Sequence, residues 1–454
     1  MSPAPPAAGG LHRAGPADRA RFLLRVLLPG AAEGLIRRRP WAMSLAERLR
    51  TDRAAITTLR DLRHRYGPRP LRLSVAGRSL VLLLDPDDLA RLLRETPDPF
   101  TPASWEKRRA LEQFQPHGSL ITPGPERAAR RRANEEALDS GRPEHRLAPA
   151  LTARIHQEAA AVAERARAGG QLDWDLFAAG WWRSVRRLVL GEAAAGDTAL
   201  IGLLDRLRST GNWSMLAPRR ERLRAAFLDR LRTAIDRADP DSLAGALRAG
   251  PAAREHGVDP VHQVPHWLFA FDAAGAATLR TLALLTCHPD REAEVRAETA
   301  APWPGTGREP VAPLPRTRAA VLEAVRLWPT TPVLLRESTR ATRWYGTVVP
   351  AGTAFAAFTP YFHRAEPPTG YRDRFDPDIW RDGTAAGNPA LVPFSAGPAG
   401  CPGEQVVLLT AGHWLAGLLA GTRYRTVSAL RPGPDRPLPA TFDHTGLRFT
   451  ARRA

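Results

Sequence analysis

Cysteine and lysine are almost absent from this chain of 454 residues. It has two cysteines, Cys287 and Cys401, which are too few for a disulfide framework or a four-thiolate metal site. If a thiolate matters for function, it therefore acts alone. Lys107 is the single lysine among 65 basic residues, so all the others are arginines.

The near-absence of lysine affects how the net charge of +18 is interpreted. A basic surface can bind nucleic acid because it neutralises phosphates and releases counterions. Here the arginines are scattered along the whole chain among alanines and prolines, which indicates a coding bias. We therefore expect no nucleic-acid partner. A basic face that attracts an acidic protein partner stays open.

A clean membrane-spanning run is also lacking near the start of the chain. The longest early apolar run, residues 21–40, is interrupted by Arg25, Pro29 and Glu33. It therefore lacks the roughly 20 clean residues of a membrane span, and no small-residue cleavage site of a signal peptide follows it. With 43% hydrophobic and 25% charged residues, the composition is typical of a soluble globular protein. We expect a cytoplasmic protein without a membrane partner.

Helical periodicity dominates the chain up to residue 300, and strand-like segments are short. Residues 71–85 predict a hairpin around Gly77, and a helix follows from Pro86. After residue 300 come proline-rich turns, a helix over 317–328, and strand-like pieces over 331–339 and 344–358. The expected fold class is mainly α with a minor β region. We expect one large helical domain with small sheets over residues 21–454, after an unstructured tail over residues 1–20.

Cys401 lies in a loop rich in glycine and proline, directly before an apolar helical pattern. Gly397, Gly400 and Gly403 permit positive φ angles and a close approach of the backbone to a flat ligand. The helix that starts after Pro402 places the sulfur at its amino end, where unpaired N–H groups favour an anion. These features suit a thiolate that ligates a metal. On the loop alone, a buried free cysteine at a helix start stays an alternative.

The spacing of Phe394, Gly397, Cys401 and Gly403 resembles the F-x-x-G-x-x-x-C-x-G signature of the cytochrome P450 family. The resemblance implies that Cys401 is the axial ligand of the iron of haem b, with the other residues of the signature around the cofactor. It also implies the large helical fold of that family. Further landmarks of the family occur in order over roughly residues 20–450.

Two helical motifs extend the resemblance. Glu323 and Arg326 match the family's E-x-x-R and lie three residues apart on one helix face, which implies a structural ion pair. Ala274, Gly275 and Thr278 match the A-G-x-x-T of the long helix that crosses the haem, which implies a catalytic role. At Gly275 we expect room for dioxygen, and at Thr278 a hydroxyl that bonds back to the Ala274 carbonyl and loosens the helix.

Three arginines resemble the family's partners of the haem propionates. Arg127 and Arg131, one helical turn apart, match two positions of its G-P-x-H-x-x-x-R motif. Arg336 resembles the arginine on one of its strands. The resemblance also implies an apolar pocket for a fairly bulky substrate, lined by Trp105, Phe114, Phe271, Ala274, Val333 and Leu334.

One departure from the family's pattern concerns proton delivery. Ala277 stands where the family usually has an acid directly before the threonine. General acid–base relays contribute about 10²- to 10⁴-fold to a rate. Thr278 with ordered water, or Asp272 about one and a half turns earlier, are the alternatives.

Two other departures concern the anchoring of the cofactor. Ala399 stands where the family usually has a histidine or arginine for a propionate, so we expect haem to be retained with altered tuning. Ile379 stands where the family often has an arginine that completes the network of the E-x-x-R pair. Arg374 or Arg381 could substitute, or the network is a simple pair.

The resemblance implies a bacterial, soluble haem-thiolate monooxygenase that inserts one oxygen atom into an apolar small organic molecule, in specialised metabolism. Electron donation by a thiolate favours O–O cleavage. The chain has no flavin or iron–sulfur motif. We therefore expect electrons from an acidic ferredoxin and its ferredoxin reductase, and a monomeric protein.

Ala277 leaves a second interpretation open. It is a haem-thiolate enzyme driven by peroxide, or one that catalyses oxidative coupling, dehydration or rearrangement. A third interpretation is a non-catalytic haem or ligand-binding protein.

Overall fold

Helices make up most of the computed structural model, which describes residues 10–454 apart from 76, 217, 301–310, 366–369 and 429–430. The first helices are α1 (Pro16–Phe22), η1 (Leu23–Leu27), α2 (Leu28–Glu33), α3 (Pro40–Leu49), α4 (Thr51–Tyr66), α5 (Pro86–Arg94), α6 (Trp105–Leu111), α7 (Glu126–Ala137), α8 (Ala148–Gly169) and α9 (Trp174–Leu190). Next come η2 (Glu192–Ala194), α10 (Thr198–Gly211), α11 (Glu221–Asp236), α12 (Leu243–Ala249), α13 (Pro251–Glu255), η3 (Pro260–His262), α14 (Val264–Leu285) and α15 (Pro289–Thr299). The last are α16 (Pro315–Leu327), α17 (Thr359–His363), η4 (Pro377–Trp380), η5 (Gly397–Ala399) and α18 (Glu404–Leu419).

The strands form small sheets. The largest has the order β1-β2-β8-β5-β3, built from β1 (Leu71–Val75), β2 (Arg78–Leu82), β8 (Ala354–Phe358), β5 (Val333–Ser338) and β3 (Phe100–Thr101). β4 (Gln171–Asp173), β10 (Arg448–Arg453) and β9 (Thr422–Thr426) form a second sheet, and β6 (Thr342–Trp344) pairs with β7 (Thr347–Val349). The predicted hairpin is confirmed, with Leu71 opposite Leu82. The expected class, mainly α with a minor β region, is confirmed too.

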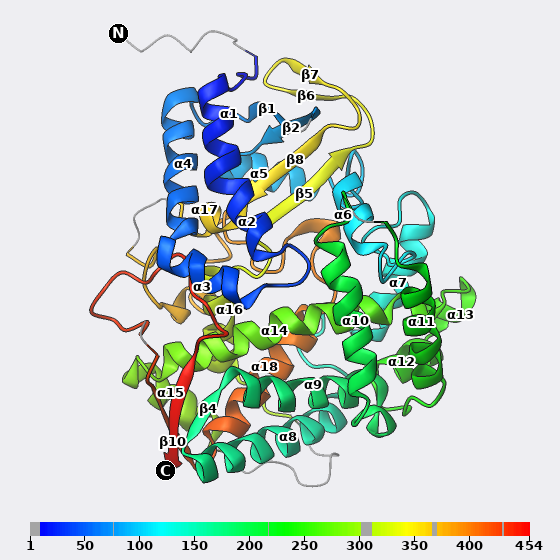
Figure 1. Ribbon diagram of the computed structural model, residues 1–454, viewed down its shortest axis with the longest axis vertical. Coiled ribbons are helices and arrows are strands. Elements are labelled where there is room, and N and C mark those ends of the chain that lie inside the picture. The colour runs from blue at the N-terminus through cyan, green and yellow to red at the C-terminus, as the bar shows by residue number, and fades with distance from the viewer. Residues whose placement is uncertain (1–9, 76, 217, 301–310, 366–369, 429–430) are drawn as a thin grey trace.

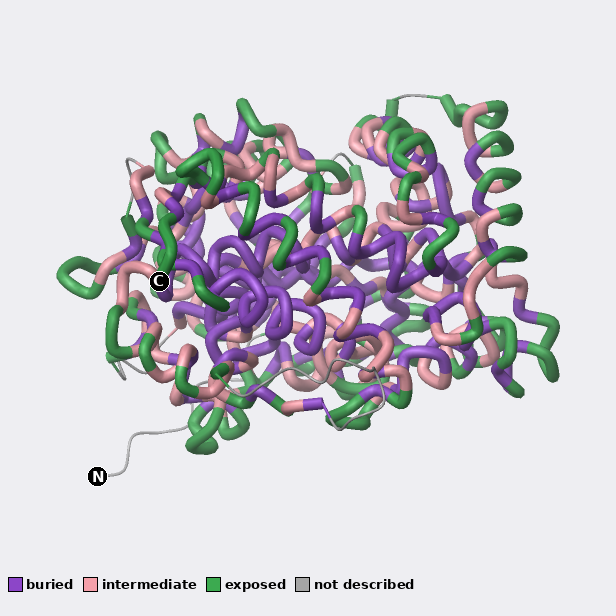
Figure 2. Tube along the Cα trace, turned by 90° about the horizontal axis from the view of Figure 1, so that it is seen from below, coloured by how far each residue is buried: buried purple, intermediate pink, exposed green. Residues whose placement is uncertain are grey.

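The five-stranded sheet lies at one end of the molecule together with α1 and α4, and the helical body fills the other end (Figure 1). α14 crosses the middle and contacts α9, α16 and α18. Buried segments concentrate in the interior, while the outer helices show an exposed face (Figure 2). Two apolar clusters match this division, one among the helices and one between the sheet and the first helices.

α14 is the most central helix. Together with the preceding turn, Pro260–Leu285, it is long and apolar enough to cross a membrane, but 78% of its apolar window is buried inside the protein. A helix that is apolar on all sides is expected in the core of a large protein as much as in a bilayer. The helix from Pro86 begins as the sequence predicted, because Asp85 caps it and accepts a hydrogen bond from the Asp87 N–H at 3.0 Å.

The predicted unstructured tail over residues 1–20 is wrong for residues 10–20. Residues 16–20 belong to α1, and the Leu11 N–H donates to Thr347 Oγ1 at 2.8 Å. Asp18 is buried and accepts bonds from Arg65 Nη1 at 2.8 Å and from the Tyr66 hydroxyl at 2.7 Å. These contacts with distant segments hold the start of the chain. Residues 1–9 of the predicted tail lie outside the described residues.

The Glu323–Arg326 pair on α16 is fully buried, with both side chains 0% exposed and 2.7 Å between Arg326 Nη2 and Glu323 Oε1. Neither Arg374 nor Arg381 completes it with a guanidinium, as the sequence analysis had considered. Instead Arg326 donates to the carbonyl of Arg374 at 2.9 Å, and the Trp380 indole N–H donates to Glu323 Oε2 at 3.0 Å. The Arg381 guanidinium binds the Asp378 carboxylate. The network is therefore larger than a simple pair.

Replacing the buried carboxylate should destabilise the fold strongly. In Glu323→Gln the Arg326 guanidinium keeps its charge in the interior without a counter-ion. We expect the free energy of unfolding to fall by about 3–5 kcal/mol, measured by unfolding in urea.

Arg381→Ala is the matched control, since it removes an arginine from an ion pair in which both side chains are more than a third exposed. It should change the free energy of unfolding by at most about 1 kcal/mol. Equal effects of the two substitutions would contradict a structural role of the buried pair.

Candidate functional site

The loop that carries Cys401 is held in place by α7 and by its own backbone. The Cys401 N–H donates to the carbonyl of Phe394 at 2.9 Å. Arg131 Nη1 donates to the carbonyl of Gly400 at 2.7 Å, and the Ser140 hydroxyl donates to the carbonyl of Pro402 at 2.6 Å. The backbone carbonyls directly before and after Cys401 are thus held by Arg131 and Ser140, which lie in α7 and just after it.

Only Gly397 among the three loop glycines needs a positive φ, which is +68°. A Cβ built on Gly397 would lie 2.2 Å from the Leu93 carbonyl oxygen at the end of α5, so the loop can pack there only with glycine. Gly400 and Gly403 have negative φ angles of −58° and −98°. The expectation of positive φ at these two positions is therefore wrong.

Cys401 is accessible yet closely surrounded by protein atoms. Its side chain is exposed to a water-sized sphere. Burial among protein atoms nevertheless raises the pKa of its thiol to about 11. The sulfur can therefore be reached by a ligand although it has lost most of its hydration.

The thiol of Cys401 is therefore neutral unless a cation displaces its proton. The Gly403 N–H bonds to the sulfur and the positive charge of Arg131 lies nearby, and both lower the pKa, but loss of hydration outweighs them. The helix start thus favours an anionic sulfur, as expected, but does not outweigh the effect of burial. A coordinated metal ion deprotonates a thiol outright. Within the described part of the chain, no group of three or more His, Cys, Asp or Glu residues could hold a metal ion, so Cys401 would be a lone protein ligand.

Two of the three predicted propionate partners lack a carboxylate partner. Arg127 is 8% exposed, and its Nε has no hydrogen-bond partner among the described residues. Arg336 is 2% exposed and donates to the Thr96 and Ser395 hydroxyls and to a backbone carbonyl. Burial and the nearby charge of Arg127 lower the pKa of Arg336 to about 10. Two buried cations that repel one another require an anion between them or beside them.

Arg131 behaves differently from Arg127. Its guanidinium binds the Glu135 carboxylate on α7 as well as the carbonyl of Gly400. In this arrangement Arg131 supports the cysteine loop. Ala399 belongs to the short turn η5 before the cysteine and offers no polar side chain.

These residues fit haem b. The accessible thiol of Cys401 matches the porphyrin iron. The guanidiniums of Arg127 and Arg336, which have no carboxylate partner among the described residues, match the two propionates. Cys401 would hold the iron, and Arg127 with Arg336 would hold the propionates.

The predicted bond within α14 is present. The Thr278 hydroxyl donates to the carbonyl of Ala274 at 2.8 Å, and Thr281 does the same to Ala277 at 2.8 Å. The helix nevertheless runs without interruption from Val264 to Leu285. The expected loosening of its hydrogen-bond ladder is therefore not observed.

Gly275 makes room for Trp181 rather than for dioxygen. A Cβ built on Gly275 would lie 2.9 Å from Trp181 Nε1. The indole cannot move away easily, because its N–H donates to the carbonyl of Phe271 at 2.9 Å and its ring packs against Phe177 and Trp414. The absence of a side chain at Gly275 thus allows α9 and α14 to pack closely.

Asp272 does not take the place of the missing acid at Ala277. Its carboxylate forms an ion pair with Arg208, a residue of α10 that is 2% exposed. Arg208 also lies over the ring of Phe269, 5.2 Å from its centroid. The only acidic side chain of α14 is therefore held towards α10 by a buried cation.

The six predicted pocket residues differ in their surroundings. Phe114 is fully buried and its ring lies 5.6 Å from that of Phe269, while Phe271 and Ala274 are each 4% exposed. Val333 and Leu334 begin β5, opposite Phe358 and Ala357 of β8. Trp105 is 39% exposed, and its ring lies beside two guanidiniums, those of Arg78 and Arg109. The structure brings Phe114 to α14, whereas Trp105 has a polar environment.

Phe269 of α14 and Arg208 of α10 were not among the site residues predicted from the sequence, although the Arg208 guanidinium lies over the Phe269 ring. His266, Phe269 and Ala273 are half-buried at helical spacing, while most of α14 is fully buried. These three residues therefore form the more accessible stripe of the helix. No signal in the sequence marks it, because the helix is apolar on all sides.

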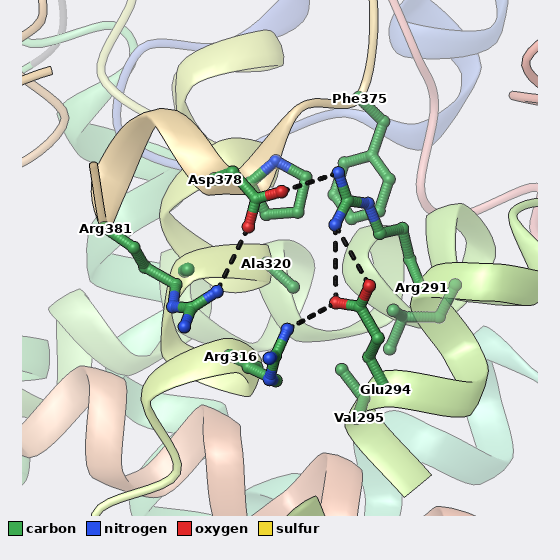
Figure 3. A pocket seen from close by; sticks show the side chains of 11 residues that line it. Arg291, Glu294, Val295, Arg316, Ala320, Phe375, Asp378 and Arg381 are labelled. Carbon is green, nitrogen blue, oxygen red and sulfur yellow. Dashed lines mark hydrogen bonds and ion pairs between the residues drawn. The ribbon is translucent and has the colours of Figure 1, made fainter. Parts of the chain in front are cut away.

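The best-formed surface hollow lies elsewhere, between α15, α16 and η4, and is filled by ion pairs (Figure 3). Arg291 binds Asp378 at 2.8 Å and Glu294 at 3.2 Å, and Arg316 binds Glu294 at 2.7 Å. The space left holds no more than about one water molecule. We assign it no ligand.

Comparison with known proteins agrees with this site. Residues 270–420 match the family model described as Cytochrome P450. The matched segment contains the A-G-x-x-T stretch, the E-x-x-R pair and the cysteine loop. A cyanobacterial cytochrome P450 structure with bound retinoic acid, CYP120A1, has a similar fold, with a TM-score of 0.70 and 19% identity over 87% of this chain and 94% of that one. The haem domain of cytochrome P450DA gives a TM-score of 0.66 and 18% identity over 88% and 92%.

Curated relatives match over shorter stretches. Cyclooctat-9-en-7-ol 5-monooxygenase of Streptomyces melanosporofaciens is 29% identical over 240 residues, which are 50% of this chain and 52% of that protein. Cytochrome P450 4c3 of Drosophila melanogaster is 30% identical over 146 residues, 30% of this chain and 27% of that protein. The chain thus spans about half or less of the length of these relatives. The family match thus covers residues 270–420, and the fold over most of the chain is that of cytochrome P450 structures, a family whose members bind haem b.

A methyl group at position 275 should destabilise the protein, because it collides with the fixed indole of Trp181. We expect Gly275→Ala to lower the free energy of unfolding by about 1–3 kcal/mol, measured by unfolding in urea. In the background of Trp181→Leu the same substitution should cost much less, because the two residues are in contact. Additive effects in this double-mutant cycle would contradict the packing role of Gly275.

Removing the unpaired charge of Arg127 should act oppositely on the haem-free and the haem-bound protein. Arg127→Met should leave the haem-free protein equally stable, or more stable by about 1–3 kcal/mol, because an uncompensated buried charge is lost. It should also speed the transfer of haem to apomyoglobin, because a propionate loses its partner.

Arg132→Met, which removes an exposed charge from the same helix, should change neither the stability of the haem-free protein nor the rate of haem transfer. Unchanged haem transfer in Arg127→Met would contradict the assignment of Arg127 to a propionate.

Proposed function

We propose that residues 21–454 act as one haem-thiolate monooxygenase unit that oxidises an apolar small organic molecule with dioxygen. The observation that carries this proposal is that the Cys401 side chain is accessible although protein atoms surround it, while the buried Arg127 and Arg336 lack anionic partners among the described residues. We further propose a role in specialised metabolism for a soluble, cytoplasmic, bacterial monomer.

Haem b, when bound, supplies the activation of dioxygen and the transfer of one oxygen atom to the substrate. The chain's own residues prepare the site for it. The Gly403 N–H bonds to the Cys401 sulfur and the charge of Arg131 lies nearby, so both stabilise its anionic form. Arg131 and Ser140 keep the loop in position through the carbonyls on either side of the cysteine.

Around its A-G-x-x-T stretch, α14 supplies few polar groups. The Thr278 hydroxyl is bonded to Ala274 and is the polar group of the A-G-x-x-T stretch, so a proton must reach the site through this hydroxyl and water. Phe271 and Ala274 are nearly fully buried and exclude bulk water from the part of α14 around the Thr278 hydroxyl. A dry site of this kind favours an apolar substrate.

A basic face around the cysteine loop supports an acidic electron donor, for which we propose ferredoxin with its reductase. Three exposed arginines come from segments that contact the loop. Arg94 is the last residue of α5, which packs on η5. Arg132 follows Arg131, which binds the Gly400 carbonyl. Arg142 lies two residues after Ser140, which binds the Pro402 carbonyl. Positive charge there would steer an acidic partner to the side of the sulfur.

The names of similar proteins agree with an apolar substrate. One relative is a monooxygenase of cyclooctat-9-en-7-ol, and the structure of another similar protein contains retinoic acid. Both molecules have large hydrocarbon bodies with one polar group. We propose a substrate of the same general class for this chain.

A second candidate function is peroxide-driven oxidation, or a coupling, dehydration or rearrangement, on the same haem-thiolate site. Two observations favour it. Ala277 replaces the usual acid, and the carboxylate of Asp272 is already bound by Arg208. A site poor in acids is less able to handle the protons that reduction of dioxygen consumes.

Turnover with two oxidants separates the candidates. Ligands found by their shift of the ferric spin state would be incubated with the protein in two ways. One incubation contains isotopically labelled dioxygen, ferredoxin, its reductase and a nicotinamide donor, and the other contains only hydrogen peroxide. For a monooxygenase we expect a product that carries one labelled oxygen atom in the first incubation.

Product in the peroxide incubation alone would replace the first candidate by the second. If every spin-shifting ligand stays unchanged in both incubations, the chain binds haem and ligand without catalysis, and the proposal fails.

A further inference from the structure

Lys107, the single lysine of the chain, lies on α6 without an acidic partner. Its Nζ donates to the carbonyl of Leu335 on β5 at 2.9 Å. No carboxylate among the described residues forms an ion pair with it. Glu106, the nearest acid on the same helix, binds Arg78 at 3.4 Å.

The surroundings of Lys107 resemble those of Cys401. A water-sized sphere reaches part of the side chain, yet loss of hydration moves the pKa of its ammonium well below the usual value. The amine is therefore also accessible in part although protein atoms surround it. The charged and titratable groups that face it are Arg336 on β5, His266 on α14 and Glu106 on its own helix.

The charges around the proposed cofactor do not balance without a further anion. Arg127, Arg336 and Lys107 are cationic side chains without a carboxylate partner among the described residues. The two propionates of haem b would compensate the two arginines. One amine is then left without a counter-ion, and a buried unpaired cation is costly.

We infer that Lys107 anchors an anionic group of the substrate, a carboxylate on an otherwise apolar molecule, in the space between α6, β5 and the half-buried face of α14. This inference rests on the proposed monooxygenase function and narrows its substrate class. Phe269 and Phe114 line the same stretch of α14 and would contact the hydrocarbon body.

A lysine suits this role better than the arginine that the chain uses at every other basic position. The ammonium is a compact charge with three donors, of which the Leu335 carbonyl takes one. Its pKa responds to the environment, so an anionic carboxylate beside it stabilises the protonated ammonium form. An arginine would remain charged in the empty pocket beside Arg336.

The single lysine allows a direct test by nuclear magnetic resonance. Protein labelled with carbon-13 at the lysine ε position gives one lysine signal, which Lys107→Met identifies by its loss. The diamagnetic ferrous-carbonyl state is used, so that its absorption band reports thiolate ligation in the same sample. We expect this signal to shift towards that of the ammonium form when an apolar carboxylate is added.

Matched ligands measure the contribution of the charge. Dodecanoate and abietate are titrated beside dodecanol and abietinol, and binding is followed by the ferric spin state. Each carboxylate that binds should bind at least about tenfold more tightly than its alcohol, and Lys107→Met should remove this preference. Lys107→Arg should restore part of it, and Arg109→Met on the same helix should leave it unchanged.

The outcomes separate this inference from the proposed function. If the ferrous-carbonyl band shows thiolate ligation but no carboxylate binds more tightly than its alcohol, or the lysine signal does not respond, the inference is overturned and the proposed function stands. The lysine signal could instead shift to that of the ammonium form on haem binding alone, with faster haem transfer in Lys107→Met. That result would assign Lys107 to a propionate and would also overturn the inference. Loss of the thiolate band in the unaltered protein would instead overturn the proposed function.

Discussion

The structure depends on one constraint, which is that a single thiol must stay accessible to a ligand while protein atoms around it remove most of its hydration. Burial raises the pKa of Cys401 to about 11, so the protein alone does not make the thiolate. The loop is nevertheless fixed on both sides of the sulfur, by Arg131 at Gly400 and by Ser140 at Pro402. A neutral thiol that is fixed in this way can become a thiolate when a metal ion binds and displaces its proton.

The same constraint accounts for the unpaired cations. An interior cation normally has an anionic partner within reach, and Arg326 shows this, because Glu323 compensates it completely inside α16. Arg127 and Arg336 have no such partner. Arg326, whose charge is compensated, is part of the scaffold. The proposed function gives Arg127 and Arg336 the role of binding the anionic groups of the cofactor.

Local sequence patterns were sufficient for much of the fold and for singling out Cys401 as the candidate metal ligand. The alternation around Gly77, the capped start at Pro86 and the all-apolar α14 each predicted an element that the structure contains. Cys401 was found from its neighbours in the chain. Each of these signals lies within a few residues, so one sequence is enough to detect it.

Contacts between distant segments could not be predicted in the same way. The space beside Gly275 is filled by Trp181, which lies 94 positions earlier in the sequence. Arg208 binds Asp272 across two helices, and the Trp380 indole, rather than an arginine, completes the α16 network. Nothing near any of these residues in the chain specifies its partner, because the partner is chosen by the packing of whole helices.

The absorption spectrum of the dithionite-reduced, carbon-monoxide-bound protein tests the central claim most directly, with the chain's two cysteines replaced in turn. Cys287 lies away from the loop, beside Thr286 and Thr426, so Cys287→Ala should keep the long-wavelength Soret band of a thiolate-ligated ferrous carbonyl. Cys401→Ala should lose that band. A band that survives in Cys401→Ala, or that is absent from the unaltered protein after haem supplementation, would contradict the account.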